Sequence, residues 1–143
     1  MDNKRFIENI NNVFKDLKNY HSKFKIEESV KGMFPVLKIL YFNDNVTPKF
    51  LETNLCVSSA RVARVLNQLE EKGLVSRIES KDDKRKTIVI LTQAGKDISK
   101  KQSEEFDKYI DIMLENISDT EKEEFIYLLR KMANNIKGAK KNV

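Results

Sequence analysis

Cysteine, histidine and tryptophan are nearly absent from this 143-residue chain, which has one Cys, one His and no Trp. A lone cysteine, Cys56, cannot form an internal disulfide, so we expect no disulfide framework and a reducing compartment. A lone histidine, His21, leaves no His/Cys cluster of the kind that holds zinc, and no signature of a carboxylate-only site is visible. We therefore expect no metal and no cofactor.

Long apolar runs and catalytic motifs are also missing. No stretch approaches the roughly 20 apolar residues that cross a bilayer, and the first residues, MDNKRFIENI, lack the apolar core of a signal peptide. We therefore expect no membrane partner and a cytoplasmic protein. The sequence has no nucleophile elbow, no glycine-rich phosphate loop, and no carboxylate pair with a plausible base beside it. These absences predict that the protein is not an enzyme.

Charge is what the chain has in abundance: 34% of its residues are charged, and the net charge is +5. The composition is not typical of disorder, because the 40% of hydrophobic residues recur at regular spacings. A moderate positive charge favours anionic partners only weakly. Its distribution is more informative, since residues 58–92 carry eight basic and five acidic side chains, whereas residues 97–115 carry three basic and six acidic ones.

Apolar residues three and four positions apart predict a mainly helical (α+β) fold of six helices, with a two-stranded hairpin between the fourth and fifth. Pro35 leaves the start of the second helix open: it begins near Phe34 or bends there. Thr47, Ser58 and Thr92 are predicted N-caps, and Gly73 is a predicted helix end. Ser118 and Glu121 form a predicted capping box. The expected helices are 6–24, 30–42, 47–55, 58–73, 92–116 and 118 onward, and the expected strands are 74–78 and 87–91.

The fourth predicted helix has two distinct faces. Val62, Val65, Leu66 and Leu69 form an apolar stripe, which leaves the polar side chains of the opposite face free. Arginine can bond guanine bidentately, a serine hydroxyl can bond phosphate or base, and the N–H groups at a helix start attract phosphate. A solvated helix face would look similar in isolation. The residues predicted to face a DNA major groove are Ser58, Ser59, Arg61, Arg64 and Gln68.

The loop between the two predicted strands concentrates basic residues. Four cations in one short connection repel each other, so an anionic partner explains them better than chance does when the fourth helix is considered too. Arg85 is predicted to enter a minor groove, with Asp83 holding its guanidinium group. Lys81, Lys84 and Lys86 are predicted phosphate contacts. Taken alone, the loop is equally consistent with an ordinary flexible charged connection.

A short capped helix, a tight turn, a helix with exposed arginines and a basic hairpin together indicate a winged helix-turn-helix. The chain resembles the MarR family of bacterial transcriptional regulators through SSARVARVLNQLEEKGLVSRIES, DDKRK and IVILTQAG. The resemblance implies homodimers with intertwined terminal helices that bind pseudo-palindromic operators, usually as repressors. It also implies possible release of DNA by a small aromatic effector.

Three positions depart from the family pattern. Ser80 replaces the first aspartate of a doubled Asp-x-Arg wing motif, which weakens the expected bracing of the wing. Cys56 occupies a turn where glycine is frequent, so strain is expected there. The first helix lacks the cysteine that peroxide-sensing members use. Cys56 itself is expected to be a small, half-buried side chain rather than a redox sensor. His21 is expected to be a residue of the dimer interface or a satisfied polar residue rather than a ligand.

The sequence thus predicts one domain, 1–143, with a winged helix-turn-helix DNA-binding lobe at 30–92. Residues 1–29 and 93–143 are predicted to form a helical dimerisation region, because their apolar stripes would otherwise be left in water. The predicted partners are double-stranded operator DNA and a second copy of the chain. The alternatives are a protein–protein adaptor without DNA binding and an RNA-binding winged helix. The RNA alternative is disfavoured by the lack of aromatic residues near the basic surface.

Overall fold

The structure is a computed structural model that describes residues 1–21 and 32–139. Within these residues the chain forms six helices and one antiparallel two-stranded sheet, which confirms the predicted fold class. The chain separates into two compact units, Met1–Lys108 and Tyr109–Val143. The elements are α1 (Asn3–His21), α2 (Phe34–Phe42), α3 (Pro48–Leu55), α4 (Ser59–Glu71), β1 (Val75–Glu79), β2 (Thr87–Leu91), α5 (Gln93–Met113) and α6 (Asp119–Ala139).

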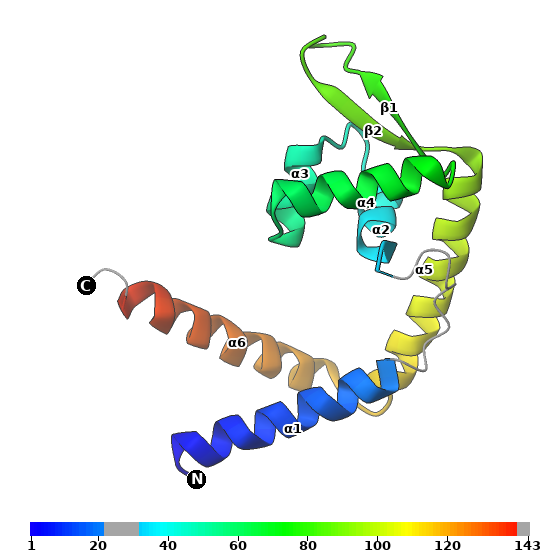
Figure 1. Ribbon diagram of the computed structural model, residues 1–143. Coiled ribbons are helices and arrows are strands. Elements are labelled where there is room, and N and C mark those ends of the chain that lie inside the picture. Colours follow the sequence, from blue (N-terminus) through cyan, green and yellow to red (C-terminus); the bar gives the residue numbers. More distant parts are fainter. Residues whose placement is uncertain (22–31, 140–143) are drawn as a thin grey trace. The chain divides into compact units, whose positions relative to one another are not determined.

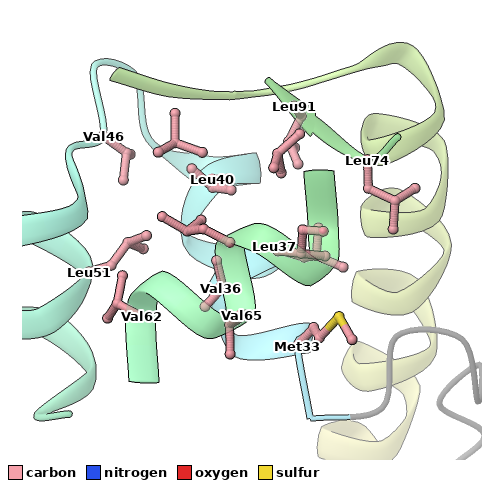
Figure 2. Packing of buried hydrophobic residues seen from close by; sticks show 14 residues of the cluster. Met33, Val36, Leu37, Leu40, Val46, Leu51, Val62, Val65, Leu74 and Leu91 are labelled. Carbon is pink, nitrogen blue, oxygen red and sulfur yellow. The ribbon is translucent and has the colours of Figure 1, made fainter. Parts of the chain in front are cut away.

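The hydrophobic core lies among α2, α3, α4 and the base of the hairpin (Figure 2). The predicted stripe of α4 is confirmed, since Val62, Val65, Leu66 and Leu69 are all buried. Burying one such leucine stabilises the fold by about 1.5–3 kcal/mol, so the stripe fixes which face of α4 meets solvent. Other members of the cluster are Leu37, Leu40, Val46, Leu51, Leu74, Val75, Val89 and Leu91.

Local hydrogen bonds fix where α2, α3 and α4 begin. The helix α2 starts at Phe34 with Pro35 in its first turn, which settles the open boundary because proline is tolerated there. The Thr47 hydroxyl oxygen accepts a hydrogen bond from the Phe50 N–H at 3.1 Å. The Ser58 hydroxyl oxygen accepts one from the Arg61 N–H at 3.3 Å. Both predicted N-caps are therefore confirmed.

The end of α4 and the start of α5 lie in direct contact, although they are far apart in sequence. Gly73 has a φ of 69°, as predicted for a residue that ends a helix. The strand β1 begins at Val75, one residue later than predicted, because the Leu74 N–H still bonds the Leu69 carbonyl at 2.9 Å. The Thr92 hydroxyl donates to the Gly73 carbonyl at 2.6 Å and accepts from the Gly95 N–H at 3.1 Å.

Gly95 lies against the backbone of the preceding turn. A Cβ atom at this position would overlap the carbonyl oxygen of Leu74, which is a backbone atom and cannot rotate away. Glycine thus permits the first turn of α5 to pack directly on the turn that follows α4.

The two terminal helices were predicted from apolar stripes, and they carry these stripes on exposed faces. The capping box of α6 is confirmed, with the Ser118 N–H donating to Glu121 Oε2 at 2.8 Å and the Glu121 N–H donating to Ser118 Oγ at 3.3 Å. No residue of α6 is buried, and Val13, Phe14 and Leu17 of α1 are exposed. The side chain of His21 and the whole of Phe24 fall outside the described part. The exposed apolar residues of α6 include Phe125, Leu128, Leu129, Met132 and Ile136.

The helix α5 ends at Met113, three residues before the predicted position. A tight turn ends it, in which the Glu115 N–H bonds the Ile112 carbonyl at 3.3 Å and Asn116 adopts a left-handed φ of 61°. Among the described helices, none has both the length and the apolarity that crossing a membrane requires.

Candidate nucleic-acid interface

The exposed face of α4 presents two arginines that have no ion-pair partner among the described residues. Because the apolar stripe faces the core, Ser59, Arg61, Arg64 and Gln68 are all exposed, as is the capping residue Ser58. A guanidinium group without an intramolecular partner keeps all its donors available for an anion or a base edge. The five residues predicted for a major groove therefore lie on the exposed surface of one capped helix.

The turn between α3 and α4 contains Cys56, which adopts a left-handed conformation with φ 52° and ψ 44°. Its N–H donates to the Glu52 carbonyl and so closes the end of α3. The sequence interpretation of Cys56 as half-buried was wrong, because its side chain is exposed. At this helix end the left-handed backbone turns the side chain away from the core, and the thiol lies 3.7 Å from the Thr53 carbonyl oxygen.

The hairpin projects from the helical lobe as a narrow ribbon (Figure 1). Its strands pair in register from Val75 opposite Leu91 to Glu79 opposite Thr87. Beyond the strands, the Ser80 N–H donates to the Lys86 carbonyl and the Lys86 N–H to the Asp83 carbonyl, both at 2.9 Å. These bonds give the loop 80–86 a defined backbone.

Ser80 contributes to this loop in a way that the sequence did not indicate. It is buried, and its hydroxyl oxygen accepts hydrogen bonds from the N–H groups of Asp82 at 3.3 Å and Asp83 at 3.4 Å. A serine can close such a turn locally as an aspartate does, although more weakly. Ser80 therefore still braces the first part of the wing loop, although it departs from the family motif.

Asp83 holds Arg85 in the predicted manner. The Arg85 backbone N–H and Nε donate to Asp83 Oδ1 at 3.0 and 3.2 Å, and Nη2 donates to Oδ2 at 3.4 Å. These hydrogen bonds, the side-chain ones most and the backbone one next, keep the pKa of the Asp83 carboxyl below its ordinary value of 3.8. The Arg85 side chain remains 91% exposed, so it is oriented without being covered.

Lys81, Lys84 and Lys86 surround Arg85 along the loop. All three are exposed, and none of them forms an ion pair with another residue of the described ranges. The loop therefore presents three unneutralised ammonium groups beside one clamped guanidinium group. No group of three or more His, Cys, Asp or Glu residues in the described ranges could hold a metal ion.

One residue of the region escaped the sequence analysis. Arg77 of β1 donates from Nη2 to Asn67 Oδ1 of α4 at 2.7 Å, and its Nε lies 3.4 Å from Glu70 Oε2 of the same helix. The signal that could have found it is strand alternation, since Arg77 shares a strand face with the buried Val75. A cation on the inward face of a strand requires a partner.

Comparisons with known proteins agree with this geometry. A model described as "MarR family" matches residues 32–87. YdgJ of Bacillus subtilis (strain 168), an uncharacterized HTH-type transcriptional regulator, is 37% identical over 101 residues, which are 71% of this chain and 62% of YdgJ. The chain is also 30% identical to the HTH-type transcriptional regulator SarZ of Staphylococcus saprophyticus. The 102 aligned residues are 66% of this chain and 70% of SarZ.

Among solved structures, the fold is similar to that of S. aureus MepR in a DNA complex, with a TM-score of 0.72 at 21% identity over 86% of this chain and 94% of MepR. That level of identity supports the fold, while the relatives above support the family. The chain belongs to the MarR family of winged helix-turn-helix transcriptional regulators and is not an enzyme.

Proposed function

We propose that this regulator binds double-stranded DNA through α4 and the β1–β2 wing. The observation that carries the proposal is the set of unpaired, exposed cations on two elements that contact each other, α4 and the hairpin. A helix with free arginines suits the wide major groove, and a clamped arginine on a thin ribbon suits the narrow minor groove beside it. The MepR structure, which contains DNA, supports the proposal by its similar fold.

Each site residue receives a role in this proposal. Ser58, Ser59, Arg61, Arg64 and Gln68 face the major groove, with Arg61 and Arg64 reading base edges. Arg85 enters the minor groove in the orientation that Asp83 imposes. Lys81, Lys84 and Lys86 contact phosphates, which position the protein without reading sequence.

We further propose that the active species is a homodimer. The lobe is residues 30–92, and residues 1–29 and 93–143 form the dimerisation region. Support comes from the apolar side chains of α1 and α6, which are exposed in the single chain and would be covered by a second copy. A two-fold dimer places two recognition helices about 34–36 Å apart and so binds a pseudo-palindromic operator.

We propose that the regulator acts as a repressor and that a small aromatic ligand releases it from DNA. An apolar groove of about 150 Å³ beside Arg61, lined also by Pro35, Val36, Leu55 and Val65, offers one place for such a ligand. A ligand weakens DNA binding only if it prefers the non-binding geometry. Titrating aromatic compounds against the DNA complex tests this part, and equal affinity of every compound for free and DNA-bound protein would contradict it.

The wing assignment is tested by Arg85→Ala. This change should weaken binding to the operator, sought in DNA flanking the gene, by about 10–100-fold, since one arginine contact is worth about 1–3 kcal/mol. Fluorescence anisotropy with labelled duplex measures the affinity, and sedimentation should show an unchanged oligomeric state.

Lys84→Ala is the matched change in the same loop. It should weaken binding to all duplex sequences nearly equally and reduce the slope of log affinity against log salt by about one.

Unchanged affinity for Arg85→Ala at moderate salt would remove the wing from the interface. Absence of DNA binding by the unmodified protein would favour the adaptor function instead. Preference for RNA in competition with duplex DNA would favour the RNA-binding alternative.

A further inference from the structure

Arg77 connects the wing to the recognition helix. It lies in the middle of β1, opposite Val89 of β2, on the strand face that also carries the buried Val75. From this face its guanidinium group reaches two side chains of α4, with Nη2 2.7 Å from Asn67 Oδ1 and Nε 3.4 Å from Glu70 Oε2. Asn67 and Glu70 are one helical turn apart, so a single planar group spans a turn of the helix.

We propose that Arg77 is a positioning residue for DNA binding, which fixes the orientation of the wing relative to α4. This inference rests on the proposed function, because both elements must meet one duplex at a set separation. A two-stranded ribbon has little stability of its own. The lobe holds β2 through the buried Ile88 and Val89 and through the hydrogen bond from the Val89 N–H to the Val46 carbonyl at 2.8 Å. The Arg77 fork attaches the other strand, β1, to α4 at the level of Val89.

The contact has the character of an orienting bond rather than a stabilising one. The Arg77 and Glu70 side chains are 35% and 36% exposed, and ion pairs with that much solvent contribute little to folding stability. A short hydrogen bond from a planar fork does restrict angles strongly, however. Loss of Arg77 should therefore leave the lobe folded while allowing the hairpin to move relative to α4.

A direct phosphate contact is the competing role for this cation. The two roles differ in what the partners do. If Arg77 contacts phosphate, Glu70 opposes DNA binding by its negative charge, and Glu70→Gln should strengthen binding. If Arg77 positions the wing through Glu70 and Asn67, then Glu70→Gln and Asn67→Ala should weaken binding.

The experiment compares Arg77→Ala, Arg77→Lys, Asn67→Ala and Glu70→Gln in the full chain by fluorescence anisotropy with operator duplex at several salt concentrations. We expect Arg77→Ala to lose about tenfold in affinity, with an unchanged salt slope and an unchanged melting temperature. Arg77→Lys, which retains the charge but not the fork, should not restore binding. Arg85→Ala should lose less affinity in the Arg77→Ala background than alone, because a loosely oriented wing no longer delivers Arg85 to the groove.

A measurement without DNA separates this inference from the proposed function. Amide residual dipolar couplings of α4 and the hairpin should fit one alignment tensor in the unmodified protein and two in Arg77→Ala. If the protein binds no DNA but the couplings change in this way, the proposed function fails and the orienting link stands.

Two results would overturn the inference. One is a single tensor in Arg77→Ala together with unchanged affinity. The other is a salt slope reduced by about one with rescue by Arg77→Lys, which would make Arg77 a phosphate contact. If Arg77→Ala does not fold, Asn67→Ala, which removes only an exposed partner, decides the same questions.

Discussion

At the scale of single residues, the turn between α3 and α4 contains a conformation that its residue does not favour. A left-handed backbone costs a residue with a Cβ atom about 1–2 kcal/mol, and Cys56 adopts one. Glycine removes this strain but adds entropy to the unfolded chain, by about 0.5–1 kcal/mol. Cys56→Gly should therefore raise the free energy of unfolding by up to about 1 kcal/mol.

Urea denaturation measures this change. Cys56→Ala, which keeps the Cβ atom and the strain, is the matched control and should leave stability within about 0.5 kcal/mol of the unmodified protein. A Cys56→Gly variant less stable than Cys56→Ala would show that the extra unfolded-state entropy of glycine outweighs the strain of the left-handed backbone.

The Asp83–Arg85 pair makes a prediction about pH. The folded pKa of Asp83 lies below its ordinary value of 3.8, mainly because of the Arg85 hydrogen bonds. The pair therefore stabilises the folded wing above about that pH, and this contribution disappears as the pH falls through the lowered pKa. At neutral pH the clamp is complete, and DNA affinity should not vary through this group.

Carbon-detected NMR titration measures the Asp83 pKa directly. Arg85→Ala should return it toward 3.8, whereas Lys84→Ala, which removes a neighbouring charge but no hydrogen bond, should leave it low. An Asp83 pKa insensitive to Arg85→Ala would mean that the clamp is not formed in solution.

At the scale of elements, two adjacent serines at the start of α4, both proposed to face the DNA major groove, differ in what they contribute to folding. Ser58 caps the helix through the Arg61 N–H, whereas Ser59 is exposed and is a proposed DNA contact. Ser58→Ala should lower the free energy of unfolding by about 1 kcal/mol. Ser59→Ala should leave stability unchanged within about 0.5 kcal/mol and weaken operator binding.

Thermal or urea denaturation of the two variants, paired with anisotropy, distinguishes the roles. Equal loss of stability in both would mean that the cap is shared or misassigned, and unchanged DNA affinity of Ser59→Ala would remove it from the interface.

The helices and caps could be predicted because their determinants are local. Thr47, Ser58 and the Ser118–Glu121 box each bond a residue only three positions away, so the sequence contains both partners. The apolar stripe of α4 is likewise visible as spacing alone. The exposed face followed from that stripe, which is why Arg61 and Arg64 were placed correctly on the surface.

What escaped prediction depends on tertiary contacts or on backbone geometry. The Arg77 link joins residues 10 apart in sequence, and only the folding of β1 back along α4 brings them together. The exposure of Cys56 follows from its left-handed backbone, which residue type did not reveal. The bracing by Ser80 required the geometry of the loop, since the same residue elsewhere would be an ordinary surface serine.

At the scale of the whole molecule, the proposed dimer depends on the exposed apolar residues of α6. Phe125, Leu129, Met132 and Ile136 recur along one side of the helix and are between 40% and 64% exposed in the single chain. Leu129→Asp introduces a charge into this stripe and should make the protein monomeric. A monomer holds only one half-site, so operator affinity should fall by about 10²–10⁴-fold.

Sedimentation equilibrium and anisotropy measure the two effects. Asn134→Asp introduces the same charge on the opposite side of α6 and should preserve the dimer. A monomeric unmodified protein, or a dimer unaffected by Leu129→Asp, would contradict this interface.

Gly95 has a consequence for how a signal could pass through the molecule. With no side chain between them, the first turn of α5 and the Leu74 carbonyl touch directly, and Thr92 adds a bond to Gly73 at the same place. Tilting α5 must therefore carry the C-terminal end of α4 with it, as one stiff joint rather than two hinged segments. A methyl group at position 95 would push α5 away from the Leu74 carbonyl. The direct contact between the two helices therefore depends on glycine having no Cβ atom.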